Sequence, residues 1–507
     1  MGCKISDANL YSDKTGEINA EMSQAKSNSS NVNSFKTVKD YGAKGDGKTD
    51  DTKAIQAAID SRNEVIFERG TYLIKSPLIF KERILISGKK AQITYTGNDA
   101  AIKAEKLVLD VTINNLGIET SADGAKAIDF SNFSYSHLSD IYLIIRGKNS
   151  VGLYLQGNGE GSAPYYNSFS DLYIVGANKP SITNQRGIVL DEKKNSKFSA
   201  SGANGNFFNN IKRIAGLSIA VDLISGNGNM FTGVGTESIQ DYHFRFNNRS
   251  ADFTGKISSI DNNSLTDTKQ DFGIGMLSKA DVVIKEGRKT KKYTSKIIAF
   301  RKNKLTTEKH RNLATADDAQ YEVYKSKAQG NIFNNIRVEG SNNSVLAKFC
   351  YGAADNRLDN IIVSSIGRIH VIRETEDLSN RVGQPFPIVF QASDLKPNSS
   401  LQLTPTNSYL GGVPIPTTSY VDAVQIKNTS KNNPGTCKVS LFRSSAEIPL
   451  SVELTPADGN TATAVMTEYI PTGFGLLRPN DGLQLKITTD ENWKSDNIIV
   501  TVWVTNI

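Results

Sequence analysis

Cysteine, histidine and tryptophan are scarce in this chain of 507 residues, which holds three, four and two of them. Three cysteines cannot form the framework of bridges that stabilises small secreted domains, so the fold must depend on a hydrophobic core. The histidines are dispersed and none has the spacing of a zinc motif. No apolar run approaches the roughly 18 residues that a membrane-spanning helix needs. We therefore predict no metal, no cofactor and no membrane insertion.

Charge is close to balanced, with 59 basic and 52 acidic residues and a formal net charge of +7. Because the basic residues are interspersed among many acids, the sequence does not predict a nucleic-acid partner. An acidic substrate remains compatible with this balance. Hydrophobic residues make up 38% of the chain, which is enough for a globular core.

Six short segments of the chain can be laid over one another. Each has a polar residue, usually asparagine, a large apolar residue two positions later, two small or polar residues, and then an alternating strand. The segments begin at Ser136, Asn167, Asn206, Asn229, Asn331 and Asn356. The closest starts are 23 and 25 residues apart, which is typical of one rung of a solenoid. Alternation with period two indicates strands, so the sequence predicts a parallel β-helix.

The segment Asp40–Ile59, DYGAKGDGKTDDTKAIQAAI, resembles the opening segment of the pectate-lyase superfamily, most closely of bacteriophage tailspike depolymerases. This resemblance implies an all-β fold, a right-handed parallel β-helix whose first rung is covered by a short N-terminal helical cap. The repeats extend the resemblance to about residue 382. The segment is structural and transfers no catalytic residue.

The repeat divides the chain. Residues 1–33 form a polar segment that permits one short helix, and residues 34–382 form the predicted β-helix. A small inserted domain is expected at about 250–328, where the repeat is interrupted. Within it, Lys279–Arg311 holds twelve basic residues and three acids. Short alternating strands over 383–507 predict a C-terminal β-sandwich. The resemblance implies that this sandwich serves trimerisation or carbohydrate binding.

Two glutamates share one position in the repeat. With Ile336 and Val338 pointing inward, Arg337 and Glu339 point outward, and the same register places Glu237 outward. In consecutive rungs the two glutamates would lie about 4.8 Å apart, and with one rung between them about twice that. Retaining glycosidases hold two carboxyl groups about 5–5.5 Å apart and inverting ones about 6.5–9.5 Å. We therefore predict that Glu237 and Glu339 are catalytic.

A second group of polar residues follows the first glutamate. If Phe244 and Phe246 face the core, the other face of their strand holds Asp241, His243 and Arg245. A base and a cation on that face would suit β-elimination from a uronic acid. Exposed tyrosines at 165, 166 and 173 could stack on sugar rings. The residues predicted to bind substrate are Arg337, Asp241, His243, Arg245, Lys212 and Tyr173.

Together these features predict a phage tailspike that binds and depolymerises a bacterial surface polysaccharide, capsule or O-antigen, by endo-glycosidic hydrolysis. A polysaccharide lyase and a non-catalytic glycan-binding receptor protein on the same scaffold are the alternatives. We expect a homotrimer, because Ile214 and Ile362 occupy outward positions. By resemblance, the N-terminus would attach to the phage tail or baseplate, so that the virion carries the protein to the bacterial surface.

Overall fold

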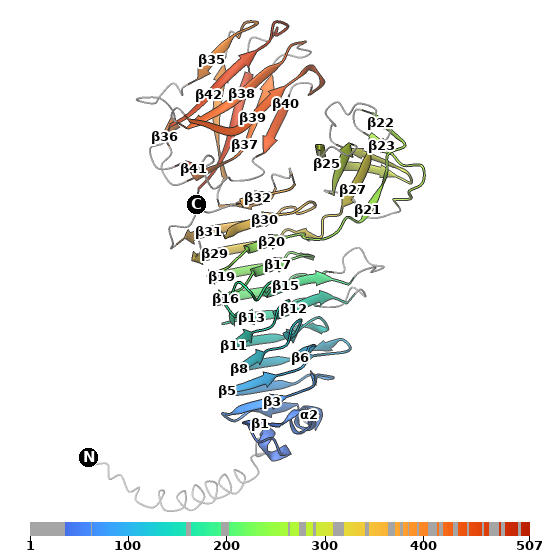
Figure 1. Cartoon of the computed structure of the whole chain (residues 1–507), viewed down its shortest axis with the longest axis vertical. Helices are drawn as coiled ribbons and strands as arrows, with labels where there is room; N and C mark the ends of the chain where they lie inside the picture. The colour runs from blue at the N-terminus through green and yellow to red at the C-terminus, as the bar shows by residue number, and fades with distance from the viewer. Residues whose placement is uncertain are drawn as a thin grey trace, which may run out of the picture.

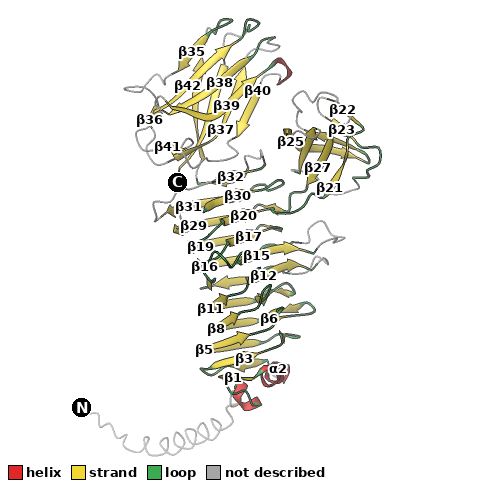
Figure 2. Cartoon of the chain, viewed as in Figure 1, coloured by secondary structure: helices red, strands yellow, loops and turns green. Residues whose placement is uncertain are grey.

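The computed structural model describes most of the chain from residue 36 onward. Residues left out of the description are 1–35, 62, 159–163, 194–201, 262–263, 273–279, 287–290, 308–318, 340–343, 364–370, 376–378, 384, 393–394, 404–412, 415–418, 429–433, 444–445, 459–460, 466–475, 478–481, 495–497 and 507. Figure 1 shows an elongated stack of strands with a smaller sheet at its side and a sandwich at its C-terminal end. Strands dominate the described part, as Figure 2 shows. The predicted all-β fold, a right-handed parallel β-helix, is confirmed.

Two parallel sheets form the solenoid. The long sheet has 13 strands. Its main path is β1 (Asp46–Asp50), β3 (Thr71–Ile74), β5 (Leu85–Tyr95), β8 (Thr112–Thr120), β11 (His137–Ile145), β13 (Ser168–Ser170), β16 (Phe207–Ala215), β19 (Met230–Glu237), β29 (Ile332–Glu339), β31 (Arg357–Val363) and β33 (Arg381–Val382), with β2 (Glu64–Ile66) and β14 (Tyr173–Val175) beside it. The second sheet has nine strands, β32 (Val371–Arg373), β30 (Val345–Phe349), β20 (Tyr242–Phe246), β17 (Ile219–Leu223), β15 (Arg186–Glu192), β12 (Val151–Gly157), β9 (Lys126–Asp129), β6 (Ala100–Lys103) and β4 (Leu78–Ile79). Two short parallel pairs complete the rungs, β7 (Val108–Leu109) with β10 (Phe133–Ser134) and β18 (Gly226–Asn227) with β28 (Ala328–Gln329).

The first rung is closed by a short helical cap, as the resemblance implies. The turn η2 (Val38–Tyr41) precedes helix α2 (Thr52–Ser61), which buries Ile55, Ala58 and Ile59. The buried carboxylate of Asp51 accepts hydrogen bonds from the backbone N–H groups of residues 44 and 45 at 2.7 and 2.9 Å, which fixes the glycine-rich turn before the helix.

The first residue of the repeat builds an asparagine ladder inside the solenoid. Each side-chain amide donates to the side-chain oxygen of the next asparagine at 2.8–3.1 Å. The ladder consists of Asn167, Asn206, Asn229, Asn331, Asn356 and Asn380, all buried. Two positions along the chain from four of these asparagines, Phe169, Phe208, Phe231 and Phe333 form a stack with ring centroids 4.1–4.6 Å apart. Both columns bind neighbouring rungs together through the core.

The two small or polar residues of the repeat form a bend in each rung of the long sheet. The second of them adopts the left-handed conformation, with φ between 51° and 69° in seven successive rungs. The residues at this bend are Asn115, Asp140, Asp171, Asn210, Gly233, Asn335 and Asn360. Asparagine, aspartate and glycine tolerate this conformation best, which explains why the repeat uses them there.

The solenoid continues directly across the 250–328 region. β19 pairs in parallel with β29, so Asn229 and Asn331 are ladder neighbours although 102 residues separate them. The intervening strands form a separate antiparallel sheet of seven strands with its own core. They are β21 (Phe253–Lys256), β22 (Ser259–Asp261), β23 (Ser264–Thr266), β24 (Asp281–Glu286), β25 (Lys291–Arg301), β26 (Lys304–Thr307) and β27 (Gln320–Tyr324).

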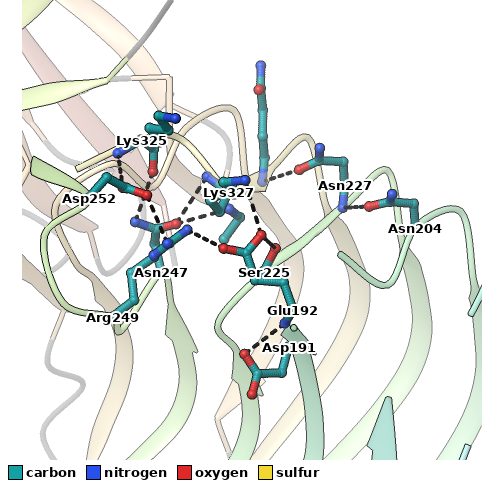
Figure 3. A network of polar contacts seen from close by, with 12 residues as sticks. Asp191, Glu192, Asn204, Ser225, Asn227, Asn247, Arg249, Asp252, Lys325 and Lys327 are labelled. Atoms are coloured by element: carbon teal, nitrogen blue, oxygen red, sulfur yellow. Dashed lines mark hydrogen bonds and ion pairs between the residues drawn. The ribbon is translucent and has the colours of Figure 1, made fainter. Parts of the chain in front are cut away.

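A polar network ties the base of this insertion to the solenoid, as Figure 3 shows. The carboxylate of Glu192, at the end of β15, pairs with Arg249 at 2.7 Å and with Lys327 at 3.1 Å. The Asn247 side-chain oxygen accepts from the backbone N–H groups of Lys327 and Ala328, both at 3.1 Å. The two ends of the insertion are therefore held side by side on one rung.

The C-terminal part is a sandwich of two antiparallel sheets, each of five strands. One holds β34 (Pro385–Ala392), β43 (Ile498–Asn506), β37 (Ser419–Asn428), β40 (Thr461–Val465) and β41 (Leu476–Leu477). The other holds β35 (Ser400–Leu403), β42 (Gly482–Thr489), β38 (Cys437–Arg443), β39 (Ala446–Leu454) and β36 (Val413–Pro414). The short turn η3 (Pro456–Asp458) follows β39.

One outward position was predicted wrongly. Ile214 is completely buried, whereas Ile362 is 67% exposed. The pairing of β16 with β19 shifts between Ile211 and Ile214, because β16 carries one more residue than β19 there. This bulge turns Ile214 into the core and leaves Lys212 and Arg213 on the outside.

Candidate active site on the outer face of the long sheet

Glu237 and Glu339 are direct neighbours in the long sheet. Their Cα atoms are register partners in the parallel pairing of β19 with β29, and Gly235 is the partner of Arg337. Along β29 the inward residues are buried and Arg337 and Glu339 are exposed. Neighbouring parallel strands lie about 4.8 Å apart, so the two carboxylates rise from adjacent points of the same surface.

Arg213 is the cation that holds the first of these carboxylates. Its guanidinium binds Glu237 through two hydrogen bonds, Nε to Oε2 at 2.8 Å and Nη2 to Oε1 at 3.0 Å. The pKa of Arg213 is raised, above all by the hydrogen bond that it donates to Glu237. A smaller contribution comes from the negative charge of Glu339. Arg337, which the sequence predicts to bind substrate, lies on the same face as Glu339, but among the described residues it is Arg213 that forms the ion pair with Glu237.

Lys212 and Tyr173 lie on the same face. Lys212 is next to Arg213 on β16, and Tyr173 is one rung further from the glutamates, on β14. The Lys212 ammonium lies 5.4 Å from the centre of the Tyr173 ring and 2.9 Å from the carboxylate of Asp171. The pKa of Asp171 is lowered, chiefly by the hydrogen bond from Lys212. The sequence placed Lys212 and Tyr173 in a substrate site, and the structure brings them together.

A hollow of about 240 Å³ continues this face toward the N-terminal rungs. Its lining includes Lys90, Gln92, Asn115, Asp140, Tyr142 and Tyr173. The rings of Tyr142 and Tyr173 belong to neighbouring rungs and lie 5.9 Å apart. We call the outward residues Tyr142, Tyr173, Arg213, Glu237 and Glu339 the outer strip. It crosses the strands and combines aromatic faces, cations and carboxylates.

His243 does not face this strip, which corrects the sequence prediction. It is 1% exposed, and its ring nitrogens lie within hydrogen-bond distance of Thr236 Oγ1 (2.9 Å) and Ser344 Oγ (3.1 Å). Burial lowers the pKa of His243 to about 4. The two hydroxyl groups satisfy the imidazole inside the solenoid, so this residue cannot contact a polysaccharide outside it.

Arg245 and Asp241 are also displaced from the predicted arrangement. Arg245 lies on β20 in the second sheet, where it binds the buried carboxylate of Asp222 at 2.9 and 2.7 Å. Asp241 is exposed in the turn that leads from β19 to β20. Because the two glutamates belong to the long sheet, the structure does not gather Arg245 with them.

Four residues of this face were not predicted from the sequence as site residues: Arg213, Asp140, Asp171 and Tyr142. Tyr142 and Asp140 belong to the first of the six repeat segments, and Asp171 lies at the bend position of the second. The overlay already aligned them, and the bend position could have identified the two aspartates as outward. Arg213 could not be found in this way, because the bulge in β16 shifts its register.

Within the described residues, no group of three or more histidine, cysteine, aspartate or glutamate side chains is arranged to hold a metal ion. In the same part of the chain, no helix is long and apolar enough to cross a membrane.

Comparisons with known proteins agree with the fold. Residues 35–133 match the family described as rhamnogalacturonase A/epimerase, pectate lyase-like. The chain is 45% identical over 82 residues to a probable glucan endo-1,3-β-glucosidase of Arthroderma benhamiae, covering 15% of this chain and 9% of that protein. It is 39% identical over 98 residues to alginate lyase 7 of Azotobacter vinelandii, covering 18% of this chain and 11% of that protein. The chain thus spans about a tenth of the length of these relatives.

Solved structures with a similar backbone path have lower sequence identity to this chain. A tailspike protein of the E. coli bacteriophage HK620 in complex with a hexasaccharide has 9% identity and a TM-score of 0.25, covering 94% of each chain. The A-module of a mannuronan C-5 epimerase from Azotobacter vinelandii has 12% identity and a TM-score of 0.25, covering 69% of this chain and 99% of that one. At these TM-scores the likenesses say nothing of what this chain binds. The family match covers residues 35–133, and the stacked rungs that continue beyond it show that this chain carries a parallel β-helix.

Proposed function

We propose that this protein is a polysaccharide-degrading enzyme, a phage tailspike that binds and depolymerises a bacterial surface polysaccharide, capsule or O-antigen, by endo-glycosidic hydrolysis. The observation that carries the proposal is the register pairing of Glu237 with Glu339 on the outer face of the long sheet. The polysaccharide-active enzymes named among the relatives support the broader assignment.

The spacing of the two glutamates suits a retaining mechanism. Adjacent strands lie about 4.8 Å apart, close to the roughly 5–5.5 Å that a retaining glycosidase needs between its carboxyl groups. Arg213 binds both oxygens of Glu237, which holds this carboxylate in place and orients it as the nucleophile. Glu339 then donates the proton to the leaving oxygen and later removes one from the water that releases the sugar.

The outer strip provides the surface along which a polymer can lie. From β11 to β29 it crosses five successive rungs, so it is about 19 Å long at the usual strand spacing. Tyr142 and Tyr173 offer ring faces to sugars, and Lys212 offers a charge to anionic groups. A strip that extends this far beyond the carboxylates favours cleavage within a chain.

The test is hydrolysis by the variants Glu237→Gln and Glu339→Gln. Each variant keeps the side-chain shape; Glu237→Gln removes the nucleophile and Glu339→Gln removes the acid and base, so depolymerisation should fall about 10²- to 10⁴-fold with folding unchanged. Glu119→Gln is the matched control, because Glu119 occupies the same register column and pairs with Arg146 at 3.0 Å. Its register partners are Thr94 and Ile144, so it has no second carboxylate in a neighbouring rung.

Purified capsules and O-antigens would be offered as a panel, and oligosaccharide products would be identified by mass spectrometry. Near-normal turnover by both glutamine variants would refute the catalytic assignment. Products that absorb ultraviolet light as unsaturated uronates would indicate a lyase instead. Binding without any shortening of the polymer would indicate a receptor protein.

The proposed tailspike is a homotrimer attached to the phage tail or baseplate through its N-terminal segment. The exposure of Ile362 supports a subunit interface, because 67% of this apolar side chain faces outward in the single chain. Light scattering should give three times the monomer mass of 55.2 kDa under native conditions. A monomer mass would contradict the trimer.

A further inference from the structure

A second column of left-handed residues runs along the solenoid, one position before the asparagine ladder. In six rungs this residue has a φ between 53° and 64°. The residues are Tyr135, Tyr166, Gly205, Gly228, Gly330 and Asp355. Glycine adopts this conformation without steric cost, whereas a bulky side chain brings its Cβ close to the following carbonyl oxygen. Two neighbouring rungs therefore carry tyrosine at a position where glycine would be easier to accommodate.

The two tyrosines gain little packing in return. Tyr135 is 60% exposed and Tyr166 is 56% exposed, so neither side chain fills the core. Their rings stack on each other instead, with centroids 5.5 Å apart and planes inclined by 29°. Tyr165 supports the pair edge-on at 6.4 Å from Tyr166. At Gly205 in the next rung, a Cβ atom would lie 3.1 Å from the Tyr166 ring, so glycine there leaves space for the ring.

Residues in strained backbone conformations that do not serve packing are concentrated at binding sites, so the strain at Tyr135 and Tyr166 indicates a function. We propose that Tyr135 and Tyr166, the tyrosine platform, form a second carbohydrate-binding site that holds a stretch of polysaccharide. The proposal rests on the proposed function in taking a bacterial polysaccharide as its ligand. Tyrosine suits such a ligand because its ring offers an apolar face to the C–H groups of a sugar and its hydroxyl reaches the sugar hydroxyls.

The platform is separate from the outer strip. Tyr166 precedes β13, the strand segment before the bend, whereas Tyr173 and the outer strip follow the bend. Phe207 and Met230, 47% and 43% exposed, are register partners on the next two rungs and lie in the column of Ser168, two positions after Tyr166. A polymer held there remains bound while another part of it is cleaved at the glutamates, which raises its local concentration at the active site.

The experiment compares two double variants. Tyr135→Asn with Tyr166→Asn removes both rings and places at each position a residue that tolerates positive φ. Tyr135→Phe with Tyr166→Phe keeps the rings. Both are made in the Glu237→Gln protein, so that the polymer stays intact, and binding to a panel of immobilised capsular polysaccharides and O-antigens is measured by surface plasmon resonance.

We expect the asparagine variant to bind at least about 10-fold more weakly, since two aromatic contacts are lost, while the phenylalanine variant stays within about threefold. The thermal midpoint of the asparagine variant should be equal or higher, because the strain is relieved. Unchanged binding by the asparagine variant would overturn the platform, whatever the glutamine variants do to hydrolysis. A changed mass in light scattering would assign the tyrosines to a subunit contact and also overturn it. Ring-dependent binding without cleavage by the native protein would support the platform and overturn the hydrolase.

Discussion

Replacing Asn229 by alanine removes a central link of the asparagine ladder. The Nδ2 group of Asn229 donates to the Ala203 carbonyl and to Asn331 Oδ1, both at 2.9 Å. Its Oδ1 accepts from the Asn206 backbone N–H at 3.0 Å and from Asn206 Nδ2 at 3.1 Å. Asn229 is fully buried, so water does not reach these groups when the amide is absent.

The cost follows from the groups that lose a partner. The Asn206 N–H and the Ala203 carbonyl each lose the hydrogen bond described here, at about 1–3 kcal/mol for a buried group. The other two groups suffer less, because Asn206 Nδ2 still donates to the Pro164 carbonyl at 3.1 Å and Asn331 Oδ1 still accepts from the Asn229 N–H at 3.0 Å. We expect Asn229→Ala to lower the free energy of unfolding by about 2–6 kcal/mol.

Guanidinium unfolding followed by circular dichroism measures this loss as a lower denaturation midpoint. Asn334→Ala is the matched control, because Asn334 lies on the outer face, where its oxygen accepts from Asn360 Nδ2 at 2.7 Å and water can replace it. The control should change stability by no more than about 0.5–1 kcal/mol. Equal midpoints for the two variants would refute the reasoning that the buried ladder stabilises the stacked rungs.

Two further predictions concern pH and salt. Burial lowers the pKa of His243 from 6.5 to about 4. The unfolded chain therefore binds this proton more readily than the folded chain does. The contribution of neutral His243 to the free energy of unfolding is fully present above pH 6.5, and it declines by up to about 3 kcal/mol as the pH falls to 4. His243→Gln should flatten this part of the measured stability curve, and an unchanged curve would contradict the assignment. If the basic residues in 279–311 attract an anionic polymer, the cleavage rate should fall as ionic strength rises from about 0.01 to 0.15 M. The reason is that the Debye length, the range of the attraction, shortens from about 30 to 8 Å. A salt-independent rate would exclude that attraction.

The fold could be predicted because the repeat contains the residues that form the internal columns of the solenoid. Asparagine at the first position and a large apolar residue at the third correspond to the ladder and the phenylalanine stack. The shared repeat position of Glu237 and Glu339 followed from the same overlay, which left open whether a rung lies between them. The pairing of β19 with β29 shows that they lie in adjacent rungs. The overlay omitted Asn380, the last ladder residue.

The errors arise where the chain departs from a constant repeat. A bulge in β16 adds one residue, which buries Ile214 and brings Arg213 to Glu237. For His243, alternation along a single strand could not reveal that Thr236 and Ser344 supply hydrogen bonds inside the solenoid. The contacts of Arg213 with Glu237 and of His243 with Ser344 join neighbouring rungs, and the contact of His243 with Thr236 joins two strands of one rung. Alternation along a single strand contains neither kind of contact.

The base of the insertion has a consequence for how such a protein can diversify. Asn247 joins the backbone on both sides of the insertion, and the ladder passes from Asn229 to Asn331 without a gap. A loop whose ends are already adjacent can change greatly in length at a small cost in closure entropy. The insertion can therefore be exchanged by recombination as one cassette, while the rungs that carry Glu237 and Glu339 keep their register.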